Sequence, residues 1–260
     1  MITTNLQGGL GNVLFQIAVA ESLALDNSDN AVFDIDGHRI GLQGYNASKY
    51  KPNVLKNVLN ICLDTNGYTV HQENGHHYQP ISYTENILLD GYFQSPLYFN
   101  HHKDHIIKLF TDNDIYKKIS DEWYDKLKNS VSIHIRRGDY LKNPNHHPFV
   151  GLQYIRQSIK YFDDKNIDKF FVFSDDILWC KQNLGLGEKF VYIQGTQDYE
   201  DLYIMSLCWD HIISNSTFSW WASYLNKKSD KKIVAPKIWF GPALSHLDTS
   251  ELYTIVNQTF

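Results

Sequence analysis

The residues best suited to chemistry are two adjacent arginines, Arg136 and Arg137, in the segment His134-Ile-Arg-Arg-Gly-Asp139-Tyr. They follow an apolar run typical of a strand, and a glycine comes directly after them. The chain has only four arginines, and a guanidinium group holds phosphate oxygens in a fixed orientation through its planar set of donors. A surface ion pair with Asp139 would also account for the arrangement, but the position at a strand end favours binding of an anion.

A second candidate is the segment Ser214-Asn-Ser-Thr-Phe218-Ser-Trp-Trp, which lies between a short apolar run and a helical pattern. Hydroxyls at the start of a helix can cap it, and together with the free backbone amides they also suit a phosphate. Ser216 and Thr217 are therefore expected to bind the same anion as the arginines. Trp220 and Trp221 are expected to pack in the core.

A third candidate is the segment Phe173-Ser-Asp175-Asp176, again at a strand end that opens a helix. Capping of that helix explains one of the two carboxylates. The other, which we assign to Asp175, is available to bind ribose hydroxyls or base amines of a nucleotide.

A glycine-rich segment, Gln7-Gly-Gly9-Leu-Gly11-Asn12, lies between the first apolar run and the first helical pattern. Glycines at this place let the backbone approach a ligand, although a tight turn from strand to helix needs them too. The segment is not a dinucleotide fingerprint, because a leucine follows where the third glycine belongs. Asn12 and Gln16, beside the glycines, could orient sugar hydroxyls.

The 12 histidines raise the possibility of a metal site, above all His101, His102 and His105, which could share a helical face. No HExxH or DxD motif completes such a site. The sequence therefore predicts solvated histidines, no metal and no other cofactor.

The second half of the chain alternates between strand and helix patterns. Strands are expected at 131–137, 169–173, 189–193, 211–214 and 232–235, and helices at 152–165, 176–184, 198–208 and 217–225. This alternation predicts a parallel sheet covered on both faces, with ligands bound beyond the carboxyl ends of its strands.

The first half of the chain also alternates between strand and helix patterns, but less regularly. Strands are expected at 2–6, 31–35 and 87–92, and helices at 12–25, 103–110 and 114–127. The stretch 37–83 has no clear period and is expected to form loops with short helices. A boundary near residue 130 would give two α/β domains, 1–130 and 131–260.

Composition excludes several classes of protein. A formal charge of -5 argues against a nucleic-acid-binding protein, which needs positive charge to bind phosphates. No apolar run is long enough to span a membrane. The start of the chain lacks the features of a signal peptide, which predicts a cytoplasmic protein. Three cysteines without a CxxC motif are expected to be reduced thiols in the core.

These motifs, in this order, resemble glycosyltransferase family 11, the α-1,2-fucosyltransferases, and especially its small bacterial and viral members. The resemblance covers most of the chain outside 37–83. It is carried by the segments 8–18, 91–99, 134–140, 173–184, 198–226 and 231–240.

The resemblance implies a GT-B type fold, with two Rossmann-like domains facing across a cleft. It further implies inverting, metal-independent transfer of L-fucose from GDP-β-L-fucose to the 2-hydroxyl of a terminal galactoside, in surface-glycan synthesis and with a peripheral place at the inner membrane. The second half would hold GDP and the first half the galactose-terminated acceptor.

The resemblance also implies roles for particular residues. Arg136 would contact the β-phosphate with support from Arg137, and His134 would brace the strand end or the donor pocket. Diphosphate contacts from the late helix would come from Ser216, Thr217 and Phe218.

Inverting fucosyl transfer requires fixed cations at the departing diphosphate and favours a base near the attacking hydroxyl. Asp139 is the first candidate for the base, although it could serve only to orient the arginines, and a strongly dissociative transition state would need little or no base. Val13 departs from the family, which usually has glutamine there. Two alternatives stay open: another nucleotide-sugar donor or linkage on the same fold, and a non-catalytic glycan- or nucleotide-binding module.

Overall fold

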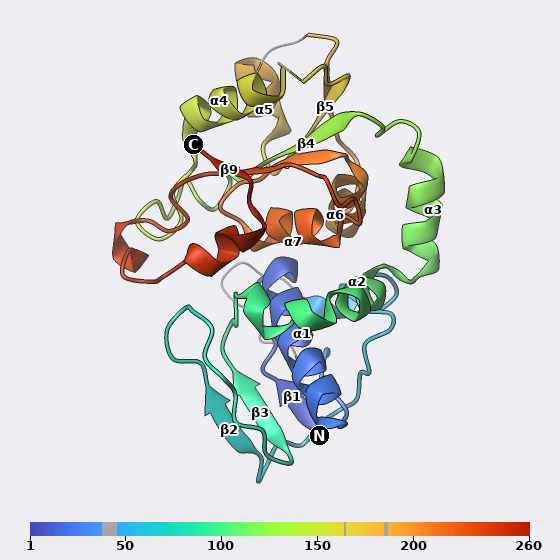
Figure 1. Ribbon diagram of the computed structural model, residues 1–260, viewed down its shortest axis with the longest axis vertical. Coiled ribbons are helices and arrows are strands. Elements are labelled where there is room, and N and C mark those ends of the chain that lie inside the picture. The colour runs from blue at the N-terminus through green and yellow to red at the C-terminus, as the bar shows by residue number, and fades with distance from the viewer. Residues whose placement is uncertain (38–45, 164, 185–186) are drawn as a thin grey trace. The chain divides into compact units, whose positions relative to one another are not determined.

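The computed structural model describes residues 1–37, 46–163, 165–184 and 187–260 (Figure 1). The chain divides into two compact units, one formed by Met1–Lys117 with Asp248–Thr254 and the other by Lys118–Leu247 with Ile255–Phe260. The expected boundary near residue 130 lies within the second unit, because helix α3 (Asp114–Trp123) groups with that unit from Lys118 onward.

The second unit is built on a six-stranded parallel sheet with the order β6-β5-β4-β7-β8-β9. The strands are β4 (Ser130–Ile135), β5 (Lys169–Ser174), β6 (Phe190–Tyr192), β7 (Asp210–Ile212), β8 (Ile233–Ala235) and β9 (Gln258–Thr259). The chain starts on the central strand β4, moves outward to β6, and then returns to continue on the other side from β7. This is the strand order of a doubly wound, Rossmann-like sheet.

Helices cover both faces of this sheet, as the alternating sequence pattern predicts. They are α4 (Gly151–Asp163), α5 (Ile177–Leu184), α6 (Asp198–Leu207) and α7 (Thr217–Leu225). Figure 1 shows α4 and α5 on one face and α6 and α7 on the other. Right-handed crossovers place helices in this way when the strand order reverses at the middle of a sheet.

The two faces of β4 differ in chemistry, because successive side chains of a strand point to opposite sides. Val131, Ile133 and Ile135 belong to a buried apolar cluster that also contains residues of α4 and α5. The alternate residues are polar: Ser132 hydrogen bonds to Nδ1 of His211 at 2.8 Å. The buried polar side of β4 is therefore satisfied by partners on its neighbours.

His211 should make folding sensitive to acid. The side chain is buried between Ser132 and Asn226, and burial lowers its pKa from 6.5 to about 3. Below pH 6.5 the His211 imidazole binds a proton in the unfolded chain but stays neutral in the folded chain. The free energy of unfolding therefore falls as pH is lowered from 6.5 toward 3. The expected contribution is up to about 1.4 kcal/mol per pH unit.

Urea unfolding of the wild type and His211→Gln between pH 7 and pH 4 measures this contribution. Glutamine keeps hydrogen-bonding capacity but does not titrate, so the variant should lose that part of the pH dependence. The matched control is His246→Gln, at an exposed position. Equal slopes for the wild type and His211→Gln would contradict the assignment.

The first unit holds a three-stranded parallel sheet with the order β1-β3-β2. The strands are β1 (Ile2–Thr4), β2 (Thr69–Gln72) and β3 (Ile87–Asp90), and the helices are α1 (Leu10–Asn27) and α2 (Lys103–Thr111). Short 3-10 helices lie at Ala47–Tyr50, Pro96–Tyr98 and Asn100–His102, and two more follow in the C-terminal region at Pro242–Leu244 and Ser250–Ile255. The strand expected at 31–35 forms isolated bridges only, from Ala31 to Ile2 and from Phe33 to Asn60.

Two expectations for the first unit were wrong. The segment 37–83 contains strand β2 in addition to loops and a short helix; residues 38–45 of it lie outside the described residues. β2 carries almost no sequence signal because its side chains are mostly exposed and its backbone pairing with β3 defines it. Cys62 is exposed, whereas Cys180 and Cys208 are buried as expected.

Two further observations concern apolar residues. Trp220 and Trp221 of α7 are fully buried, as predicted. Among the described residues, no helix combines the length and the apolar character needed to cross a bilayer.

Candidate active site

The candidate site lies where the strand order of the second unit reverses. β4 and β7 are neighbours in the sheet, but the chain leaves them toward opposite edges. In open α/β sheets such a switch point opens a crevice beyond the carboxyl ends of the strands, where ligands bind. The loop that follows β4 begins with Arg136, and Ser214 lies in the loop that follows β7.

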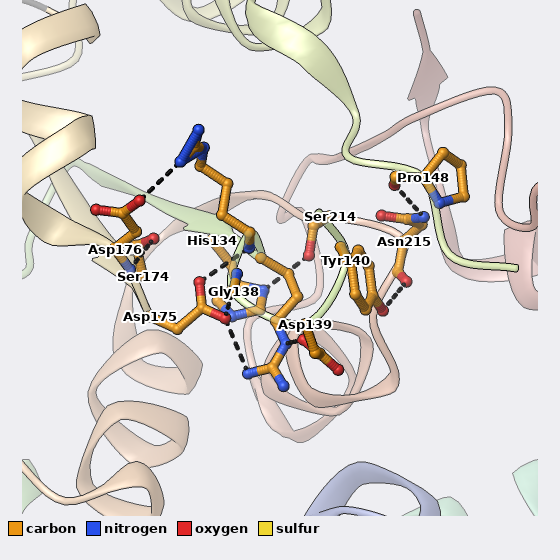
Figure 2. A network of polar contacts seen from close by, with 12 residues as sticks. His134, Gly138, Asp139, Tyr140, Pro148, Ser174, Asp175, Asp176, Ser214 and Asn215 are labelled. Atoms are coloured by element: carbon orange, nitrogen blue, oxygen red, sulfur yellow. Dashed lines mark hydrogen bonds and ion pairs between the residues drawn. The ribbon is translucent and has the colours of Figure 1, made fainter. Parts of the chain in front are cut away.

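A buried hydrogen bond joins β4 to the loop after β7. Nδ1 of His134 lies 2.9 Å from the hydroxyl of Ser214 (Figure 2). The imidazole ring of His134 lies 5.5 Å from the ring of Phe218. Burial, with a smaller effect of the nearby Arg136, lowers the pKa of His134 to about 3. His134 is therefore a neutral bracing residue at neutral pH.

A second link comes from Tyr140. Its hydroxyl donates to the carbonyl of Asn215 at 2.8 Å, and the Asn215 amide donates to the carbonyl of Pro148 at 3.0 Å (Figure 2). The same amide donates to the carbonyl of Trp239 at 2.9 Å. Tyr140 and Asn215 are both buried. The loop after β7 is thus held at two points, by His134 of β4 and by Tyr140 of the loop after β4.

Arg136 lies at the centre of this arrangement. Its Nε is 2.8 Å from Oδ1 of Asp139, its Nη1 is 3.3 Å from Oδ2 of Asp175, and its guanidinium lies 5.9 Å from the ring centroid of Tyr140. The side chain is 23% exposed, so an incoming ligand can reach it. The ion pair with Asp139 that the sequence raised as an alternative is present, and it fixes the orientation of the guanidinium.

Arg137 is directed elsewhere. Its Nη1 pairs with Oδ2 of Asp176 at 2.7 Å, and its guanidinium lies 4.3 Å from the ring centroid of Trp179 and 5.5 Å from that of Phe149. Adjacent residues of an extended segment point to opposite sides, which separates the two guanidinium groups. Arg137 therefore lies on the α5 side of the sheet, and its guanidinium group points away from that of Arg136.

Replacement of Arg137 should cost stability more than ligand binding. Arg137→Ala removes a largely buried ion pair and two cation–π contacts, which together contribute about 1 to 3 kcal/mol. Chemical unfolding of Arg137→Ala and Arg136→Ala, with GDP titrations of both, separates the two roles. A larger loss of GDP affinity in Arg137→Ala than in Arg136→Ala would contradict this assignment.

Asp175 shapes the loop that carries the arginines. Its carboxylate accepts the backbone N–H groups of Arg137 and Gly138 at 2.9 and 3.0 Å (Figure 2). A Cβ at Gly138 would lie 2.9 Å from Oδ2 of Asp175, so a larger residue at this position would push the carboxylate aside. Asp176 accepts the N–H of Trp179 and caps α5, as one carboxylate of the pair was expected to do.

The N-terminus of α7 completes the candidate site. Ser216 is the N-cap residue, but its side chain makes no capping hydrogen bond to the helix backbone. Ser216, Thr217 and Phe218 are all partly exposed. The hydroxyls and the positive end of the helix dipole are thus placed beside the His134 and Tyr140 links, in the arrangement that suits an anion.

The glycine-rich segment lies in the first unit, where hydrogen bonds from Gln16 hold it in place. Gln16 is fully buried, accepts the N–H of Gln7 at 3.0 Å and donates to the carbonyl of Gly91 at 3.1 Å. Its side chain therefore holds the loop in place and offers no atom to a sugar hydroxyl in this conformation. Gly9 is the N-cap residue of α1, and Gly11 is buried within the first turn.

Residues that the sequence did not single out hold the glycine-rich segment and the segment that follows β3. Gln94 donates to Oδ1 of Asn12 at 3.1 Å. Glu73 accepts the N–H groups of Tyr92 and Phe93 at 2.7 and 3.0 Å. Gln94 was within reach of sequence reasoning, because it belongs to the segment 91–99 that carries part of the family resemblance.

Comparison with solved structures places the fold. The chain is similar to fucosyltransferase NodZ from Bradyrhizobium, with a TM-score of 0.53 at 17% identity, covering 88% of this chain and 96% of that chain. NodZ α-1,6-fucosyltransferase co-crystallised with GDP gives a TM-score of 0.51, also at 17% identity, over 85% and 91% of the two chains. The fold is therefore that of a GT-B type glycosyltransferase, as the resemblance implied.

Comparison of sequences gives the family. The model of glycosyl transferase family 11 matches residues 1–244, and the chain belongs to that family. It is 30% identical to an α-1,2-colitosyltransferase of Escherichia coli over 92% of each chain. It is 29% identical to the O-antigen biosynthesis glycosyltransferase WbnK of the same species, over 90% of this chain and 93% of WbnK. A bovine galactoside 2-α-L-fucosyltransferase is 25% identical over 86% of this chain and 64% of its own length.

Proposed function

We propose that this glycosyltransferase transfers L-fucose from GDP-β-L-fucose to the 2-hydroxyl of a terminal galactoside, with inversion and without a metal ion. The observation that carries the proposal is made at the switch point of the second unit. There, hydrogen bonds from His134 and Tyr140, on either side of Arg136, reach the loop between β7 and the N-terminus of α7. Family membership and relatives named as α-1,2-transferases and galactoside fucosyltransferases support the linkage and the acceptor.

In the proposed reaction the bond between C1 of fucose and the β-phosphate oxygen breaks while the acceptor oxygen bonds to C1 from the opposite face. Negative charge grows on the departing GDP, and Arg136 with the α7 N-terminus neutralises it. This fixed positive charge takes the place that a metal ion occupies in other transferases, so activity is expected to survive EDTA.

The acceptor hydroxyl must lose its proton during the attack. Asp139 is our candidate for the base, because its carboxylate is 30% exposed and lies beside Arg136. His134 is unsuited to that task, since its depressed pKa and its contact with Ser214 make it a bracing residue. The acceptor would be bound by the first unit.

One finding supports GDP-colitose as a second candidate donor beside GDP-fucose. A relative that matches 92% of the chain is named an α-1,2-colitosyltransferase, and colitose lacks one ring hydroxyl of L-fucose. The proposed diphosphate contacts do not involve that hydroxyl, so they suit either GDP-sugar. The choice between donors must depend on contacts to the sugar ring.

The experiment is incubation of the purified protein with GDP-fucose and lactose in EDTA, followed by linkage analysis of the product by NMR. We expect a 2'-fucosylated product. Parallel reactions with GDP-colitose and other nucleotide sugars compare the donors. Absence of α-1,2-linked fucose on every galactoside tested would overturn the proposal, and GDP binding without turnover of any donor would favour a binding module.

A further inference from the structure

A cluster of metal-ligating side chains lies in the first unit and plays no part in the proposed reaction. Asp26 is in the last turn of α1, and His101 and His102 end the 3-10 helix Asn100–His102 that leads into α2. Nε2 of His102 lies 2.7 Å from Oδ1 of Asp26, and Nε2 of His101 lies 3.0 Å from Oδ2. The cluster joins two segments that are 75 residues apart in the sequence.

The geometry differs from that of scattered surface histidines. One ligand atom from each of the three residues lies within 4.8 Å of the other two. The rings of His101 and His102 are 4.4 Å apart, and both direct Nε2 to the same carboxylate. The sequence predicted solvated histidines here, but the structure brings these two together around an acid.

The surroundings also fit a site. The hydroxyl of Ser22, a buried residue one turn before Asp26, lies 3.3 Å from Nε2 of His101. The side chains of Asp26, His101 and His102 are 43%, 49% and 29% exposed, so an ion can enter from solvent. His105 is engaged separately, with Nε2 3.5 Å from Glu21.

The donor set selects the kind of ion. Two imidazole nitrogens and one carboxylate oxygen suit Zn²⁺, whereas Mg²⁺ and Ca²⁺ prefer oxygen ligands. Tetrahedral zinc with bonds of about 2.0 to 2.2 Å separates its ligand atoms by roughly 3.3 to 3.5 Å. The distances from Asp26 to the two imidazoles lie slightly below that range, so a small outward movement would admit the ion.

We propose that Asp26, His101 and His102 form a Zn²⁺ site, with water as the fourth ligand, that ties the end of α1 to the start of α2. Both histidines already contact the Asp26 carboxylate in the structure. The site is independent of the proposed transfer reaction, because its ligands lie outside the candidate active site.

The test is calorimetric titration of ZnCl₂ alone into the whole protein, freed of metal with EDTA and desalted, at pH 7.5. We expect one ion bound per chain. Asp26→Asn, His101→Gln and His102→Gln should each lower the affinity at least about 10-fold, because loss of a ligand costs no less than loss of a residue that supports one. The exposed His246→Gln is the matched control and should bind like the wild type.

Thermal unfolding supplies a second readout. Zn²⁺ should raise the Tm of the wild type and of His246→Gln but not of the three ligand variants. The Tm values without metal show whether each variant folds. No zinc binding by the wild type, or equal binding by the wild type and all three ligand variants, would overturn the proposal; neither result bears on fucosyl transfer.

Discussion

Replacing Arg136 by alanine is expected to lower kcat/KM about 100- to 1,000-fold, the effect of removing one preorganised donor to a developing negative charge. The guanidinium is already oriented by Asp139 and Asp175, so it needs little rearrangement to meet a leaving diphosphate. Initial rates with GDP-fucose and lactose measure the loss. Most of it should appear in kcat, because the charge on GDP grows in the transition state.

Two variants make this result specific. Arg136→Lys keeps the charge without the planar set of donors and should recover only part of the activity. Arg137→Ala should retain much more activity than Arg136→Ala, since its guanidinium pairs with Asp176 and stacks on Trp179. Near-normal turnover in Arg136→Ala would remove this residue from the mechanism.

Replacing Asp139 by asparagine is expected to lower kcat about 100- to 10,000-fold if the carboxylate is the general base. Initial rates with GDP-fucose and lactose measure the loss. GDP affinity should be kept or improved, because a carboxylate that neutralises Arg136 has been removed.

The alternative role of Asp139 predicts a different pattern. If the carboxylate only orients Arg136, then GDP binding weakens in Asp139→Asn. Asp175→Asn is the matched control, because Asp175 also pairs with Arg136 but in addition holds the backbone of Arg137 and Gly138. Full activity of Asp139→Asn would contradict both roles.

Much of the second unit could be predicted from the sequence. Apolar runs and helical spacing indicated the strands and helices, since a parallel sheet covered on both faces buries nearly every side chain of its central strands. β4 is buried throughout, and its neighbours β5 and β7 were expected from the same pattern. The shared edge of these strands then placed the candidate site.

The different directions of Arg136 and Arg137 were also within reach of the sequence. Side chains alternate along a strand, and Val131, Ile133 and Ile135 mark the apolar face that Arg137 continues. Adjacency in the sequence suggests that Arg136 and Arg137 act together. Applying the two-residue period would have separated them.

Other features depend on contacts that no local pattern encodes. β2 is mostly exposed and is defined by its pairing with β3. The burial of Gln16 comes from its bond to the carbonyl of Gly91, far along the chain. The meeting of Asp26 with His101 and His102 likewise requires packing of α1 beside the segment before α2.

The central claim is that Arg136 and the start of α7 hold the β-phosphate of the donor. Calorimetric titration of GDP and GMP into the wild type and Arg136→Ala tests it directly, because the two nucleotides differ only by that phosphate. The account predicts that the wild type binds GDP more tightly than GMP and that Arg136→Ala loses about 10- to 100-fold of this preference. An unchanged preference for GDP in Arg136→Ala would contradict it.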